Sequence, residues 1–199
     1  MKVKIKKEGK VESFNLISSW SDVTLETWLK LIDFETGTKT EEAEETIAAL
    51  SDIPRRLVKE LSLSDVAVIM SKVGELQAKQ DTNLKRIIEI NEVEYGFHPD
   101  LSEITLGEYA DIEQFIKNGI DKQLPELMSV LYRPIKLKKN DIYIIEPYDG
   151  DIRLRAEEMK LMSAEQVQSA LVFFYTLGKV LSEILPLYLM ERLKEMKTQ

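Results

Sequence analysis

The chain has 199 residues, which is enough for one domain with a sizeable core or for two small ones. Hydrophobic residues make up 44% and charged residues 31%, a composition typical of a globular protein rather than a disordered chain. The net charge of −8 disfavours nucleic-acid binding, which depends on neutralising phosphates, and the absence of cysteine excludes disulfides and thiolate metal sites.

Five of the first ten residues are lysines, at positions 2, 4, 6, 7 and 10. Apolar and polar residues alternate over 2–5 and again over 11–16, with Gly9 between the two runs, which predicts a β-hairpin. Lysines on the solvent face of a strand protect a sheet edge, and this explains the run better than a phosphate-binding arm. We do not expect a secretory signal, because no apolar segment follows this charged start.

Helices are expected to follow this hairpin, at 25–36, 39–50, 55–61 and 65–76. Thr24 and Ser64 are the expected N-caps of the first and the last of them. Acidic side chains over 39–45 suit the start of the second helix, and Pro54 separates it from the third.

The second half is expected to contain a hairpin at 87–97, helices at 105–118, 124–132 and 152–159, and a strand at 141–146. Asn91-Glu92 forms the hairpin turn, and Pro134 stops the second of these helices. Ser163 and Gln166 match a capping box, which opens a long final helix toward Lys197.

A self-similarity connects the two halves. Residues 21–25 match residues 102–106, and an aromatic residue, Trp28 or Tyr109, follows each segment by three positions. Threonine-leucine helix starts are common, so chance similarity is the alternative explanation. If the duplication holds, the fold is α+β and helix-dominated, with two similar hairpin-plus-helices repeats over 1–80 and 84–199 and a long C-terminal helix.

Few residues suggest chemistry. His98 is the one histidine, and it could act as a general base beside Asp100, but its place before Pro99 favours an ordinary loop residue. Residues 149–151, Asp-Gly-Asp, resemble part of a calcium loop, but the twelfth position is Lys160 instead of glutamate, so a glycine-centred turn is the better interpretation. We therefore expect no catalytic residue, no metal and no cofactor.

The dense basic spots, Arg55-Arg56 and residues 136–139, have no interleaved aromatic residues and are expected to be solvated loops. The stretch 170–190 is apolar, but Lys179, Glu183 and Pro186 interrupt it, so we expect a covered helix and no membrane span.

The final helix carries two apolar stripes, whereas a surface helix needs only one. Beyond the kink expected at Pro186, one stripe faces either a partner protein, a second copy of the chain or the first repeat. The candidate partner-binding residues are Leu185, Tyr188, Leu189 and Leu193.

Segments 106–113, 130–134, 146–151 and 163–181, in this order, resemble small acidic proteins encoded in the structural gene clusters of tailed bacteriophages. These are tail or baseplate-hub assembly chaperones and minor virion proteins. The resemblance covers about the second half of the chain and supplies no binding residue.

This resemblance implies a non-enzymatic protein that binds other proteins during virion assembly, as a tail assembly chaperone that shields an apolar surface. The alternative is a structural or packaged cargo protein retained in the virion. Expected partners are other phage structural proteins or a second copy, with no nucleic acid, membrane or small-molecule substrate. The expected location is the host bacterial cytoplasm during assembly, or the virion.

Overall fold

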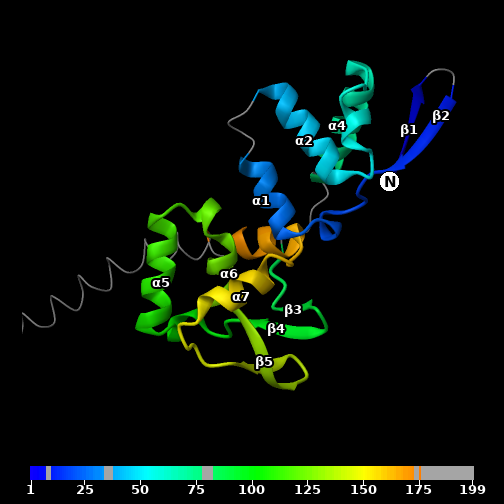
Figure 1. Ribbon diagram of the computed structural model, residues 1–199. Coiled ribbons are helices and arrows are strands. Elements are labelled where there is room, and N and C mark those ends of the chain that lie inside the picture. The colour runs from blue at the N-terminus through cyan, green and yellow to red at the C-terminus, as the bar shows by residue number, and fades with distance from the viewer. Residues whose placement is uncertain (8–9, 34–37, 78–82, 173–174, 176–199) are drawn as a thin grey trace, which may run out of the picture.

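The computed structural model describes residues 1–7, 10–33, 38–77, 83–172 and 175. It shows the predicted α+β, helix-dominated fold, with one two-stranded and one four-stranded antiparallel sheet (Figure 1). No helix in these described ranges is long and apolar enough to cross a membrane.

The first part of the chain builds a hairpin and a group of helices. Its elements are β1 (Lys2–Lys7), β2 (Lys10–Asn15), η1 (Trp20–Asp22), α1 (Leu25–Asp33), α2 (Lys39–Leu50), α3 (Arg55–Val58) and α4 (Leu63–Gln77). Val3 and Ile5 of β1 point into a core formed with Ile47, Leu50 and Ile69, while Lys2 and Lys4 stay exposed. The predicted hairpin is therefore confirmed, and Lys2 and Lys4 lie on its outer face as expected.

Capping residues fix where several helices begin. Thr38 and Glu41 form a capping box at α2, because each side chain bonds the other's backbone N–H. The predicted cap at Ser64 is wrong by two residues: α4 begins at Leu63, and Ser62 Oγ accepts from the Asp65 N–H at 3.1 Å. Both serines lie next to the helix start, and only Ser62 precedes its first turn.

The second part contains the four-stranded sheet, in the order β3-β4-β5-β6. Its elements are β3 (Ile87–Ile90), β4 (Val93–Phe97), η3 (Leu101–Glu103), α5 (Leu106–Lys117), η4 (Ile120–Lys122), α6 (Leu124–Leu131), β5 (Tyr132–Lys139), β6 (Ile142–Ile145), α7 (Ile152–Met159) and helical residues 164–172. Asn91 and Glu92 have φ values of 49° and 65°, which confirms the predicted two-residue turn. Leu127, Met128 and Met159 pack against the sheet to form a second core.

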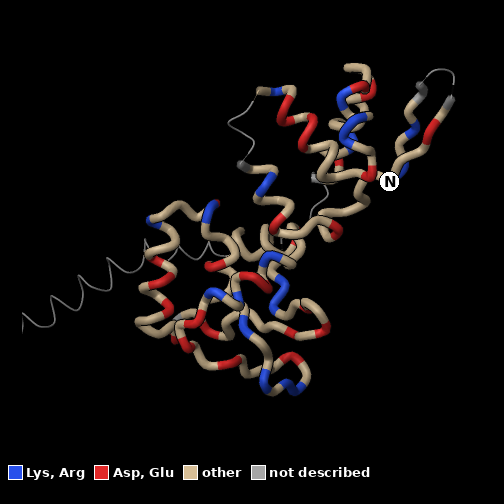
Figure 2. The backbone as a smooth tube through the Cα atoms, viewed as in Figure 1, with Lys and Arg blue, Asp and Glu red and all other residues tan. Residues whose placement is uncertain are grey.

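Residues 136–139 were expected to be a solvated loop; they are exposed as expected, but the prediction of a loop is wrong. They belong to β5, which pairs with β4 on one side and β6 on the other. Pro134 lies inside this strand opposite Tyr95, and its carbonyl accepts the Glu146 N–H at 2.9 Å. Figure 2 shows the lysines of β5 at the far end of the β5–β6 hairpin, and acidic residues along α2 and α5.

Short backbone contacts join the two parts. The Leu25 N–H donates to the Met162 carbonyl and the Ala164 N–H to the Val23 carbonyl, each at 2.7 Å. Leu25 is buried in the second core, whereas Leu106, its counterpart in the predicted repeat, is 84% exposed. In both halves, a hairpin and a 3-10 turn precede a helix whose first residue follows a threonine. The duplication itself, and the division into repeats over 1–80 and 84–199, stay predictions.

Candidate functional site

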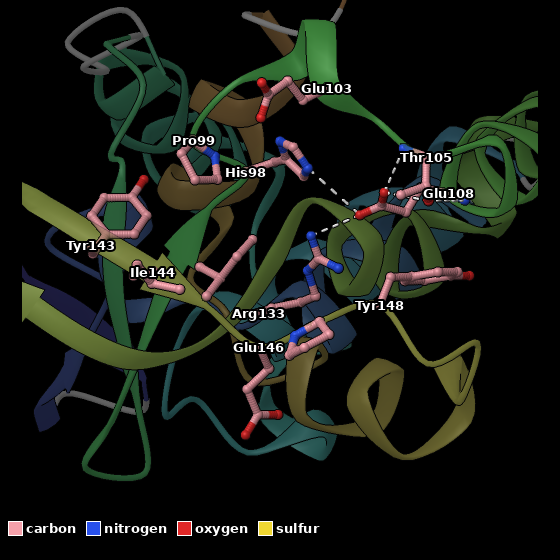
Figure 3. Close-up of a pocket in the computed structure, with 12 residues that line it drawn as sticks. His98, Pro99, Glu103, Thr105, Glu108, Arg133, Tyr143, Ile144, Glu146 and Tyr148 are labelled. Carbon is pink, nitrogen blue, oxygen red and sulfur yellow. Dashed lines mark hydrogen bonds and ion pairs between the residues drawn. The ribbon is translucent and has the colours of Figure 1, made fainter.

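An open cavity of about 410 Å³ lies between two stretches of the second part. One wall is the connection from β4 into α5, with His98, Pro99, Glu103, Thr105 and Glu108. The other wall is the run 143–148, which includes the last three residues of β6 and the three residues after it. Arg133 of β5 also lines the cavity, and Figure 3 shows its guanidinium pointing toward Glu108.

Glu108 is the centre of a buried charged cluster. Its carboxylate accepts hydrogen bonds from the Thr105 N–H at 2.8 Å and the Thr105 hydroxyl at 2.6 Å, which completes the N-terminal capping box of α5. Arg133 Nη2 lies 2.7 Å from Glu108 Oε1, and His98 Nε2 lies 3.6 Å from the same oxygen (Figure 3). The Glu108 and Arg133 side chains are only 1% and 4% exposed.

Burial and pairing act in opposite directions on these charges. Burial alone would raise the pKa of Glu108, but the Thr105 hydrogen bonds and the Arg133 charge lower that pKa below its ordinary value. Burial lowers the pKa of His98, and the nearby Glu108 charge opposes this only in part. Neutral His98 therefore accompanies a charged Glu108–Arg133 pair at neutral pH.

Two tyrosines support the cluster. The Tyr148 ring lies 5.8 Å from Arg133 Cζ, within cation–π range, and its hydroxyl donates to Asp111 of α5. The Tyr143 hydroxyl donates to the Phe97 carbonyl at 2.7 Å. The cluster and these tyrosines thus join the end of β4, the start of α5, β5 and the segment after β6.

The buried cluster is better suited to holding chain segments in place than to acid–base catalysis. Glu108 Oε2 accepts both Thr105 hydrogen bonds and Oε1 lies in ion-pair contact with Arg133, so the carboxylate is poorly placed to take a proton from a bound molecule. The described residues contain no group of three or more histidine, aspartate or glutamate side chains suited to a metal ion. Arg133 Nε and His98 Nδ1 are buried and have no hydrogen-bond partner among the described residues.

The residues singled out in the sequence lie in different places. His98 follows β4 in a loop, as predicted, and its Nε2 lies within ion-pair distance of Glu108, at 3.6 Å. Asp149 pairs with Arg155 at 2.5 Å, and Gly150 has a φ of 77°, which confirms the glycine-centred turn. Leu185, Tyr188, Leu189 and Leu193 lie outside the described residues.

Comparison of the chain with protein-family models, curated proteins and solved structures gives no match. The site must therefore be interpreted from its own geometry.

An apolar surface adjoins the cavity on the β5–β6 hairpin. Leu137, Ile142 and Ile144 are 67%, 78% and 57% exposed. Leu137 and Ile144 are cross-strand partners, and Ile142 lies two residues from Ile144, so all three share one face of the hairpin. We call these three residues the hairpin face. Ile144 also lines the cavity, so the two features are continuous.

Proposed function

We propose that this chain is a non-enzymatic protein that binds other proteins during bacteriophage virion assembly, as a tail assembly chaperone. The observation that carries the proposal is the hairpin face, Leu137, Ile142 and Ile144, because three adjacent exposed apolar side chains are typical of a protein-binding surface. Leu106, Tyr109 and Ile116 are a second exposed apolar group, spaced along α5.

Three further observations support this proposal. The charged cluster at the cavity holds segments of the fold together, as described above. The phage context rests on the resemblance of segments 106–113, 130–134, 146–151 and 163–181 to small acidic phage proteins. The net charge of −8 favours solubility of a complex that covers an apolar surface in the bacterial cytoplasm.

The test is recovery of the tagged chain from infected cells, followed by identification of bound proteins and mass spectrometry of purified particles. A chaperone co-purifies with a tail component and is absent from particles, whereas a structural or cargo protein is present in particles in a fixed ratio. Leu137→Gln with Ile142→Gln should remove the bound protein. Leu63→Gln with Val68→Gln, which changes two exposed apolar residues of α4, is the matched control and should retain it.

A further inference from the structure

The cavity runs along the free edge of a strand. β6 is the last strand of its sheet, and no other strand of the described chain pairs with its outer edge. Lys139 and Ile142 flank the two-residue turn, so they form a hydrogen-bonded backbone pair. Because hydrogen-bonded and non-hydrogen-bonded pairs alternate in an antiparallel ladder, the next residue, Tyr143, directs its N–H and C=O away from β5. Ile145 does the same by alternation, which agrees with the inward bond from the Glu146 N–H to the Pro134 carbonyl.

The cavity lining supports this placement. Residues 143–148 all contribute to it, although successive side chains of a strand point to opposite faces. A run of consecutive lining residues therefore places the cavity beside the backbone edge. An extended peptide in this position can pair with β6, which is how many proteins bind a partner strand.

Charge and burial define the chemistry of such a peptide. Glu103 and Glu146 both line the cavity, and neither forms an ion pair with a lysine or arginine of the described residues. Arg133 is the cation in the lining, and it is already paired with Glu108. The cavity therefore has an excess of negative charge, while the adjoining hairpin face is apolar.

We infer that the outer edge of β6 binds an extended segment of another protein in which basic and apolar residues alternate. Its apolar side chains cover Ile142 and Ile144, and a lysine or arginine on its other face approaches Glu103. A second copy of β6 is a poorer occupant, because two-fold pairing brings the acidic residues of both copies together. That the natural occupant is a protein rests on the proposed function.

The test uses a synthetic peptide, Lys-Val-Lys-Ile-Lys-Lys, which has the sequence of residues 2–7 and the required alternation. Its titration into the full ¹⁵N-labelled chain is followed by NMR and by amide hydrogen exchange. We expect shifts and slowed exchange at residues 143–146 and weaker binding of Glu-Val-Glu-Ile-Glu-Glu. Glu103→Lys should weaken the binding of the basic peptide about tenfold. Glu75→Lys, the same charge change on α4, should stay within about twofold.

No response at residues 143–146 with millimolar basic peptide overturns the inference, as does equal binding of the acidic peptide. If a higher protein concentration alone slows hydrogen exchange at these amides, the edge binds a second copy of the chain, and this result also overturns the inference. These failures leave the proposed function intact if a tail component still co-purifies with the chain. A chain that binds the peptide but recovers no phage protein supports the inference and contradicts the proposed function.

Discussion

Arg133→Met removes the charge of the buried pair while it retains an unbranched apolar side chain. Glu108 then stays 1% exposed, with its Thr105 hydrogen bonds but without a cation. Loss of one partner of a buried ion pair costs about 3–5 kcal/mol of unfolding free energy. Because Thr105 still donates two hydrogen bonds to the carboxylate, we expect the lower end, about 3 kcal/mol.

At this chain length, 3 kcal/mol corresponds to a fall in Tm of about 6–12 °C. Thermal and urea unfolding followed by circular dichroism measure it. Glu108→Gln should cost a similar amount, because it leaves Arg133 buried without a counter-ion. The double variant should cost less than the sum of the two, with a coupling of about 1–3 kcal/mol.

Arg55→Met is the matched control, because it breaks an arginine–glutamate pair at the surface, with Glu45 at 2.5 Å and the Arg55 side chain 71% exposed. It should leave Tm nearly unchanged. Equal effects of Arg133→Met and Arg55→Met would refute the reasoning, since the Glu108–Arg133 pair would then contribute no more than a solvated one.

Further predictions concern pH, packing and the C-terminal segment. The pKa of His98 in the folded chain lies below 6.5, so neutral His98 stabilises the fold fully above pH 6.5. This contribution is lost as the pH falls through the lower folded pKa. In His98→Gln, the unfolding free energy measured in urea should therefore change less with pH over this range. In Gly96→Ala the new Cβ overlaps the Tyr143 ring and lies 2.9 Å from Ile145 Cγ2, which should cost about 1–3 kcal/mol in urea unfolding, whereas Gly74→Ala meets open space and should not destabilise. Removal of residues from Leu185 onward should yield a soluble monomer by light scattering; aggregation would instead place this segment in the core.

Local patterns predicted most elements of the fold. The helices at 105–118 and 152–159 were predicted within one residue of their observed bounds, because capping and helical spacing depend on near neighbours. β5 was missed, because Pro134 and the lysines after it disfavour a strand locally. Its pairing with both β4 and β6 outweighs this preference.

The charged cluster could not be predicted from spacing. His98, Glu108 and Arg133 come from three separate segments, and the capping box of α5 predicts an exposed glutamate rather than a buried one. The available signal was Arg133 itself, which follows the apolar run 130–132. A charge in such a run needs a partner when the run is buried, although the sequence alone does not show that the partner is Glu108.

The strand at 142–145 has apolar residues on both faces, but only one face is buried. Tyr143 and Ile145 are buried, and the Gly96 backbone lies close enough beneath them that a side chain there would clash. Ile142 and Ile144 face outward, and no described residue buries them. A strand apolar on one face suffices for a sheet with a solvated side. The second apolar face is therefore unnecessary for the fold of the described residues, and it is the feature that a binding partner would use.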